Sequence, residues 1–185
     1  MKLLKLTLVM ILSLAMLTGC GGGGGGSSNP TGPAPDLTLQ EAYPGIYASY
    51  SLMQTTMEDN DLNLDDRINS FMSVIAEKIY LISDTAKETD KRTVLYNKTK
   101  DRLDRYTVNS WNLVPFAHTK IDDKTVQVNT RMVLSFTVIP GKVGDKSGTY
   151  YFGDTSNGEA PIVFTWVKEA DDKWRLQQGF PDDVF

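Results

Sequence analysis

The sequence predicts an α+β domain in which N-terminal helices pack on a curved antiparallel sheet. Apolar residues recur at helical spacing between residues 43 and 106, and from there to the end of the chain they alternate with polar residues. Helices followed by strands, rather than alternating with them, are typical of α+β architecture. The predicted domain, residues 36–185, is near the usual size of a single domain, so one core suffices.

Three helices are expected in the first half. Pro44 suits the first turn of a helix over residues 43–57. Asp65 is the expected N-cap of a second helix over 65–81. A third helix over 89–106 carries many charges, which predicts a surface helix with a narrow buried edge. The second helix is predicted from an apolar stripe formed by Ile68, Phe71, Met72, Ile75 and Ile79.

The second half is expected to form the sheet. Strict alternation over residues 126–138 predicts a long strand with one covered face, and a turn at Asp122 and Asp123 joins it to its hairpin partner. The Gly-, Asp- and Ser-rich stretch 141–160 is a long excursion that contains one short strand. The expected strands are, in chain order, 109–119, 126–138, 149–152, 162–168 and 174–180.

The last hairpin carries a resemblance to a known family. It reads Val163-Phe164-Thr165-Trp166-Val167-Lys168, an acidic turn, and then Lys173-Trp174-Arg175-Leu176. Helices followed by a curved meander with this ending resemble the NTF2-like, or cystatin-like cone, superfamily over residues 65–180. The resemblance implies a cone-shaped pocket between sheet and helices, in a fold that hosts enzymes, binding proteins and assembly modules alike.

Aromatic side chains are the main candidates for such a pocket. Trp166 and Trp174 lie on opposite sides of the final turn, and Trp111 and Phe136 approach the same side. Two readings stay open, because such side chains form either the core or the wall of a pocket for an apolar or aromatic ligand. The candidate pocket residues are Trp111, His118, Met132, Phe136, Trp166 and Trp174.

His118 is the only histidine, so a site with several His ligands is excluded and a Ser-His-Asp arrangement would depend on it alone. Enzymes of the resembled superfamily often pair a His with an Asp inside the cone, but no Asp has the matching context here. A non-enzymatic binding module is therefore favoured. The alternative is an enzyme of the NTF2-like type with His118 as general base.

No cofactor or metal is expected. Residues 59–65 have the alternating oxygen side chains with which a calcium loop begins. An EF-hand loop, however, needs Gly at its sixth position and Glu at its twelfth, and this chain has Leu64 and Ser70 there. An acidic turn between two helices explains these residues more simply.

The start of the chain resembles a bacterial lipoprotein signal peptide. Lys2 and Lys5 precede a short apolar run, and Leu17-Thr18-Gly19-Cys20 matches every position of the lipobox pattern. The resemblance implies that residues 1–19 are removed and that Cys20, the only cysteine, becomes the acylated first residue. A lone thiol in an oxidising compartment would otherwise be a liability.

Residues 21–35 are rich in Gly, Ser and Pro, which predicts a disordered tether. Gly21, rather than Asp, follows Cys20, and in the enterobacterial sorting scheme that this resembles such a lipoprotein goes to the outer membrane. The expected location is therefore the cell envelope, lipid-anchored, with the periplasmic face of the outer membrane favoured over the inner membrane.

The charge of the chain bears on its partners. Removal of residues 1–19 takes away Lys2 and Lys5 and changes the net charge from −4 to −6. An acidic domain argues against a nucleic-acid partner. The expected partners are the membrane, through the lipid anchor, and an envelope protein or a small apolar ligand. A homodimer through the sheet face that bears Gln127, Asn129, Arg131, Val133 and Ser135 is also open.

Overall fold

The order of helices and strands follows the predicted α+β pattern, with a short first helix, a 3-10 helix and one strand added. The computed structural model describes residues 37–81, 92–144 and 147–181. Its helices are α1 (Leu39–Ala42), α2 (Pro44–Glu58), α3 (Leu64–Ser73) and α4 (Arg92–Arg105), with the 3-10 helix η1 (Thr155–Asn157). Its strands are β1 (Ile75–Leu81), β2 (Tyr106–Asp122), β3 (Thr125–Val138), β4 (Gly148–Phe152), β5 (Ile162–Lys168) and β6 (Trp174–Phe180).

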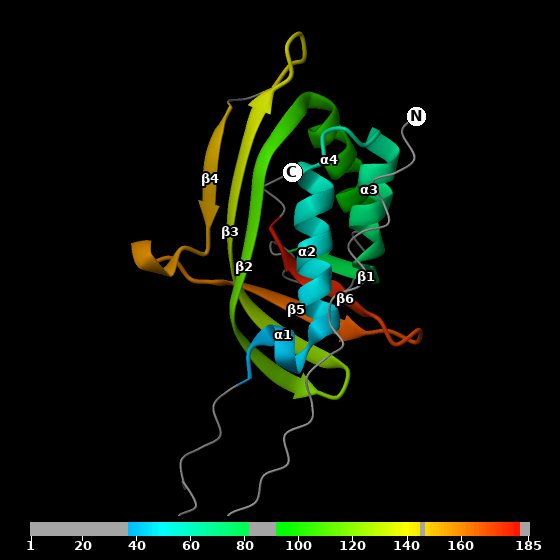
Figure 1. The fold of residues 1–185 in the computed structure, drawn as a ribbon, viewed down its shortest axis with the longest axis vertical. Coiled ribbons are helices and arrows are strands. Elements are labelled where there is room, and N and C mark those ends of the chain that lie inside the picture. Colours follow the sequence, from blue (N-terminus) through cyan, green and yellow to red (C-terminus); the bar gives the residue numbers. More distant parts are fainter. Residues whose placement is uncertain (1–36, 82–91, 145–146, 182–185) are drawn as a thin grey trace, which may run out of the picture. The chain divides into compact units, whose positions relative to one another are not determined.

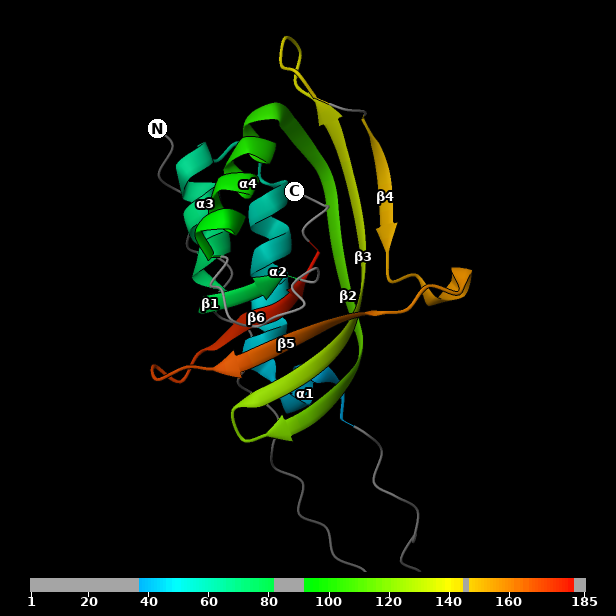
Figure 2. The ribbon, with the colours of Figure 1, turned by 180° about the vertical axis from the view of Figure 1, so that it is seen from behind.

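The strands form one six-stranded sheet in the order β1-β6-β5-β3-β2, with β4 as a further partner of β3. One half of β3 pairs with β5 and the other half with β4, so these two strands follow each other along the same edge of β3. Figures 1 and 2 show the long, curved β2–β3 ribbon with α2, α3 and α4 on one side of it. The predicted strands and the turn before β3 are confirmed.

The second predicted helix is wrong in its last part. It ends at Ser73, and Ile75–Leu81 forms β1, which pairs parallel to β6. Ile75 and Ile79 are both buried, and their spacing of four residues suits a helix as well as a strand. Only the pairing with β6, about 100 residues away in the chain, decides between the two. The sheet is therefore mixed, not purely antiparallel.

The N-cap of α3 is Asn63 instead of Asp65. The side-chain oxygen of Asn63 accepts the backbone N–H of Asp66, which satisfies one of the free donors at the helix start. Asp65 lies in the first turn, where its exposed carboxylate is 3.7 Å from the ammonium of Lys100. Asn and Asp are both suitable at an N-cap and in the first turn of a helix, so residue type alone did not show which position is the N-cap.

The outer edge of β2 is covered by polar side chains from α2 and the turn after it. Each accepts a backbone N–H that the edge strand would otherwise leave unpaired. The bonds are Leu113 N–H to Gln54 Oε1 at 2.8 Å, Trp111 N–H to Glu58 Oε1 at 2.6 Å and Val108 N–H to Asn60 Oδ1 at 3.3 Å. These bonds fix α2 along the sheet.

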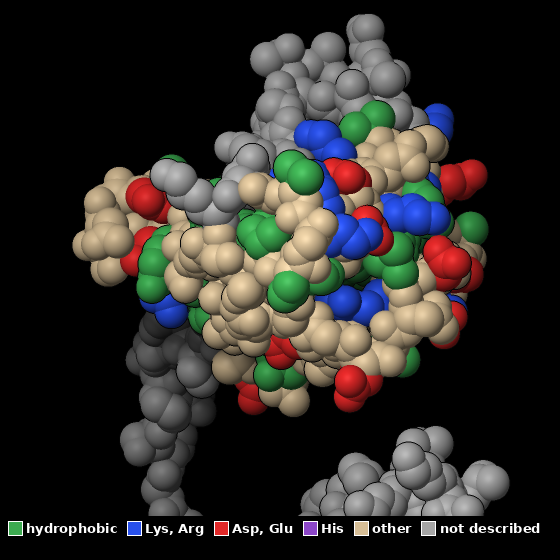
Figure 3. Space-filling view, turned by 90° about the horizontal axis from the view of Figure 1, so that it is seen from above, with side chains coloured by type: hydrophobic (Ala, Val, Ile, Leu, Met, Phe, Trp, Pro, Cys, Tyr) green, Lys and Arg blue, Asp and Glu red, His purple; other side chains and the backbone are tan. Residues whose placement is uncertain are grey.

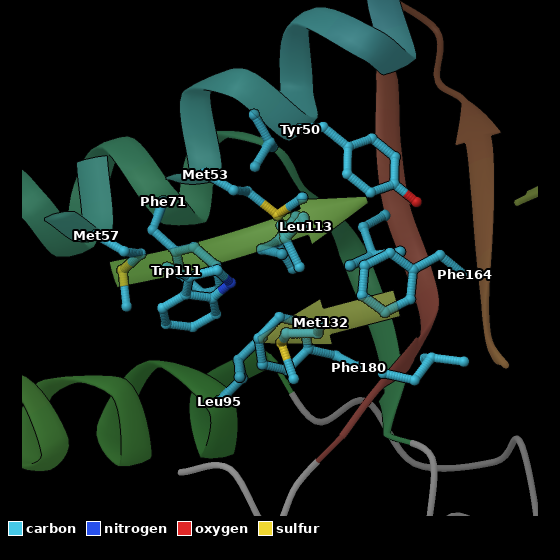
Figure 4. Close-up of a cluster of buried hydrophobic side chains, with 14 of the residues drawn as sticks. Tyr50, Met53, Met57, Phe71, Leu95, Trp111, Leu113, Met132, Phe164 and Phe180 are labelled. Carbon is cyan, nitrogen blue, oxygen red and sulfur yellow. The ribbon is translucent and has the colours of Figure 1, made fainter. Parts of the chain in front are cut away.

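The core lies between the helices and the covered face of the sheet. Figure 4 shows side chains from α2, α3, α4 and the strands pointing toward one another in this space. Phe71, Phe164 and Phe180 are each fully buried there. No helix in the described ranges combines the length and the apolar character that crossing a membrane requires.

Candidate functional site

Four of the six candidate pocket residues lie in the core. Trp111 is 1% exposed, Phe136 6%, and Met132 and Trp166 are fully buried. Alternation along β2, β3 and β5 turns these side chains toward the helices. His118 and Trp174 are only half-buried, and Trp174 packs against the edge of the core.

Aromatic rings fill the space between helices and sheet. The ring centroid of Phe180 lies 5.7 Å from that of Phe71, and 6.2 Å from those of both Trp111 and Phe164. Tyr50 extends this cluster, with its ring centroid 5.2 Å from that of Trp166. Figure 4 shows methionine side chains beside the interior rings of Tyr50, Phe71, Trp111, Phe164 and Phe180. These side chains therefore pack against one another in the place where the resemblance implies a pocket.

The hydroxyl of Tyr50 is bonded within this cluster. It lies 2.5 Å from Oγ1 of Thr130, which is fully buried on β3. Burial raises the pKa of Tyr50 well above its ordinary value, so the phenol stays neutral. Buried hydroxyl groups need hydrogen-bond partners, and Tyr50 and Thr130 provide them for each other.

His118 and Trp174 are brought together by a residue that the sequence analysis did not single out. The ring of Tyr43 contacts both, with centroid distances of 5.4 Å to His118 and 5.7 Å to Trp174, each edge to face. We call these three residues the Tyr43 row. Tyr43 is the N-cap residue of α2, and the following Pro44-Gly45 starts the helix. The row therefore joins the end of β2 to the start of β6 across the first turn of α2.

A hollow of about 510 Å³ lies at the His118 end of the row, and we call it the His118 hollow. Its lining mixes apolar and polar surface and comes from the residues in and around α1 and from β2: Leu37, Thr38, Leu39, Pro115, Phe116, Ala117 and His118. Leu37 and Phe116 are more than half exposed. No carboxylate is among these lining residues, so none of them orients the imidazole as a general base requires.

A second hollow, of about 560 Å³, lies at the Trp174 end, and we call it the Trp174 cleft. It opens between α2, the junction of α3 with β1, and the β5–β6 turn. Gly45 makes room for the indole, because a Cβ at this position would lie 3.1 Å from Cδ1 of Trp174. The lining is apolar at Ala48, Leu52, Met72, Val74 and Trp174, and charged at Arg92, Asp172, Lys173 and Arg175.

Arg92 fixes one wall of the Trp174 cleft. Its guanidinium donates to the carbonyl of Met72 at 2.8 Å, and to those of Ile75 and Ala76 at 2.6 and 2.8 Å. A cation at these carbonyls stabilises the C-terminal end of α3. This residue ties α4 to the α3–β1 junction.

The β5–β6 turn forms the opposite wall. Arg175 is bonded to Glu169 at 2.6 Å and makes a two-pronged contact with Asp171, with both N–O distances 2.7 Å. The hydrogen bond from Arg175 holds the pKa of the Asp171 carboxyl well below its usual range. Lys168 contacts Asp172 at 3.0 Å. The acids of the turn are thus engaged by these two residues.

The acidic turn between α2 and α3 is an ordinary helix connection. Asp59 accepts the backbone N–H of Asp61 at 3.1 Å, and Asn63 caps α3. Across the described ranges, no group of three or more His, Cys, Asp or Glu side chains is arranged to hold a metal ion. Cys20 lies outside the described residues, as do the predicted signal peptide and tether.

Sequence reasoning missed Tyr43, Gly45 and Arg92. Tyr43 and Gly45 flank Pro44, at the start of a predicted helix with an apolar stripe. This helix start was the sequence signal that could have drawn attention to both residues. Arg92 carried no signal, because its carbonyl partners lie some 16 to 20 positions earlier, in a segment predicted as continuous helix.

The end of the domain that is seen from above in Figure 3 carries surface charges of both signs. The view from above in Figure 3 shows Lys and Arg side chains near the middle of that face, with Asp and Glu side chains mostly toward its rim. This face is therefore mixed in charge, without the broad single-sign surface that steers nucleic acid.

No known protein-family profile and no curated protein matches the chain. Among solved structures, an NTF2-like protein of unknown function in nutrient uptake from Rhodospirillum rubrum superposes with a TM-score of 0.51 at 12% identity, over 73% of this chain and 94% of that chain. ActVI-ORFA from Streptomyces coelicolor gives 0.48 at 10% identity, over 74% and 92%. Delta 5-3-ketosteroid isomerase from Mycobacterium sp. gives 0.43 at 8% identity, over 76% and 95%. The fold is NTF2-like, and at these identities the likeness extends to the fold alone.

Proposed function

We propose that this protein is a lipid-anchored lipoprotein of the bacterial cell envelope whose NTF2-like domain binds a protein partner or a small apolar ligand without catalysing a reaction. The observation that carries the proposal is Leu17-Thr18-Gly19-Cys20, because the only cysteine of the chain stands at the position that the lipobox pattern acylates. A glycine-rich tether follows it, as suits a domain held near a bilayer.

The anchoring part of the proposal has a simple energetic basis. Each acyl CH₂ buried in a bilayer contributes about 0.8 kcal/mol, so one chain binds marginally and several chains hold firmly. A lipoprotein-type modification of Cys20 would therefore keep the domain at the membrane. Because Gly21 is not Asp, we place it at the outer membrane.

The binding part of the proposal is supported by the geometry of the domain. The space between helices and sheet is occupied by packed rings, as with Phe71, Trp111 and Phe180. The described hollows lie instead on the two sides of the Tyr43 row. In the His118 hollow the imidazole has an aromatic neighbour and no lining carboxylate, which favours binding over general-base catalysis.

A second partner class is another copy of the chain. β3 turns Gln127, Asn129 and Arg131 away from the helices, toward the open face of the sheet. The register of the sheet places Tyr151 beside Val133 and Val163 beside Asn129 on that face. Tyr151 is 56% exposed and Val163 39%. We propose that this mixed face forms the homodimer contact.

Anchoring is tested by a single substitution. In a bacterial host fed labelled palmitate, we expect the wild-type chain to carry the label and to sediment with membranes. Cys20→Ala removes the acceptor thiol, so label and membrane association should both be lost. Ser27→Ala in the tether is the matched control and should change neither. A Cys20→Ala chain that still sediments with membranes would contradict the proposal.

The choice of membrane is tested in the same host. Gly21→Asp supplies the residue that retains lipoproteins in the inner membrane in the enterobacterial scheme. In a density gradient, we expect the wild type in the outer-membrane fractions and the variant in the inner-membrane fractions. The same distribution for both chains would remove the outer-membrane assignment and leave the anchor untouched.

A further inference from the structure

We propose that the Trp174 cleft binds a small apolar monoanion, with the apolar body against Trp174 and the acid group at Lys173. The proposal rests on the binding role given above and does not depend on the lipid anchor. The volume of the cleft, about 560 Å³, is within the roughly 300–1,000 Å³ typical of small-molecule sites.

The apolar part of the site comes from three elements. Ala48 and Leu52 project from α2, Met72 and Val74 come from the end of α3 and the residue after it, and the half-buried indole of Trp174 comes from β6. Leu52 is 39% exposed, so this part of the wall is open to solvent. An apolar body placed here would cover exposed apolar surface on more than one side, which favours binding in water.

The indole is held in position before any ligand arrives. The ring of Tyr43 packs edge-on against it with a centroid distance of 5.7 Å, and the lack of a Cβ at Gly45 lets α2 approach it closely. A side chain that already has one fixed orientation loses less conformational entropy when a ligand binds than a mobile side chain does.

The polar part of the site is identified by comparing the charged groups. Asp172 is engaged by Lys168, and Arg175 by Glu169 and Asp171. Arg92 donates to three backbone carbonyls and acts as a fixed wall. Lys173 adds, after Arg175, to the lowered pKa of Asp171, but no salt bridge of its ammonium is present among the described residues, and it lines the cleft next to Trp174. Lys173 is therefore the group that a ligand anion would meet.

The test compares two probes with almost the same apolar body. 8-Anilinonaphthalene-1-sulfonate carries one negative charge, and N-phenyl-1-naphthylamine is neutral. All chains carry Cys20→Ala, so that no attached acyl chain competes and binding outside the domain is common to every variant. We expect one saturable site for the sulfonate, with about tenfold tighter binding than for the neutral probe, as a charge-assisted bond supplies.

Two substitutions, together with one control, assign the site. Lys173→Gln should abolish the preference for the sulfonate, and Lys120→Gln, which removes the same charge from the end of β2, should leave it unchanged. Trp174 is half-buried, whereas Trp111 is 1% exposed and Trp166 is fully buried. A probe in the cleft should therefore quench mainly the emission of Trp174, and Trp174→Phe should remove most of this quenching. Unchanged near-ultraviolet circular dichroism shows that each variant is folded.

Competition then separates the two sources of such an anion. Displacement of the sulfonate by 1-naphthoate points to an aromatic acid, and displacement by decanoate points to a fatty acid. Equal affinity for the two probes, or an unchanged preference in the Lys173→Gln variant, would overturn the inference. Either result would leave the outcome of the anchoring test at Cys20 unchanged, so failure of the anion site can be distinguished from failure of the proposed lipid anchor.

Discussion

Single arginine side chains join the helices of this domain by hydrogen bonds to backbone carbonyls at helix C-termini. Arg67 on α3 is 5% exposed and donates from Nε to the carbonyl of Thr56 at 3.4 Å and from its terminal nitrogen to that of Met57. Burial lowers the pKa of Arg67, while the nearby charge of Asp59 opposes this effect. Arg92 does the same for the end of α3. Two arginines thus satisfy carbonyls that helix ends leave free.

Replacement of Arg67 should destabilise the domain. Arg67→Met keeps much of the apolar stem but leaves the carbonyls of Thr56 and Met57 without their donor, so we expect the free energy of unfolding to fall by about 2–4 kcal/mol. Arg67→Lys keeps a charge and one donor and should lose less. Urea denaturation followed by circular dichroism measures both. A Met variant as stable as the Lys variant would show that these hydrogen bonds contribute little.

At the scale of elements, the β5–β6 hairpin depends on a glycine near its end. Gly179 has a φ of +100°, and a Cβ there would lie 2.0 Å from the carbonyl oxygen of Val163. The register between the two strands shifts between Thr165 and Trp166. Such a close approach of two backbones, at a positive φ, admits no other residue without movement of the strand.

Gly179→Ala should therefore cost far more than an ordinary substitution of glycine. We expect a loss of about 3 kcal/mol or more, because the strain at φ adds to a backbone clash. Gly158→Ala is the matched control, since Gly158 has a φ of +80° with no atom near its Cβ position, and about 1 kcal/mol is expected there. The midpoint of thermal unfolding measures both changes. Equal shifts would show that the strand yields to the methyl group at little cost.

At the scale of the whole molecule, helices cover one face of the sheet, and no helix of the described residues covers the other face (Figures 1 and 2). The open face mixes apolar and polar side chains, among them Val114, Arg131 and Tyr151, and they are brought together by the register of β2, β3 and β4. A large, partly apolar surface of this kind is the natural place for contact with a second copy.

The dimer proposal is tested by a charge on the open face. Val133→Lys places an ammonium there, so we expect it to shift the protein from dimer to monomer in sedimentation velocity. Val143→Lys is the control, because Val143 is 86% exposed in the β3–β4 connection and should leave the association unchanged. A wild-type chain that sediments as a monomer would remove the proposal.

The candidate site was predictable only in parts. Trp174 and His118 were named from the sequence, and the structure joins both to Tyr43. The other four pocket candidates, Trp111 and Trp166 among them, are core residues, because a pattern of buried positions is the same whether the enclosed space is open or filled. Side-chain volumes on opposing elements decide between the two, and no local pattern contains them.

The sequence alone determined the α+β class, the extent of α2, and the strands from β2 to β6, because local periodicity and turn residues specify these elements. Only the tertiary structure decided that Ile75–Leu81 is a strand, that Arg92 binds the α3–β1 junction, and that rings fill the space under the sheet. Each of these depends on contacts between residues far apart in the chain. Such contacts select one conformation where the local pattern permits several.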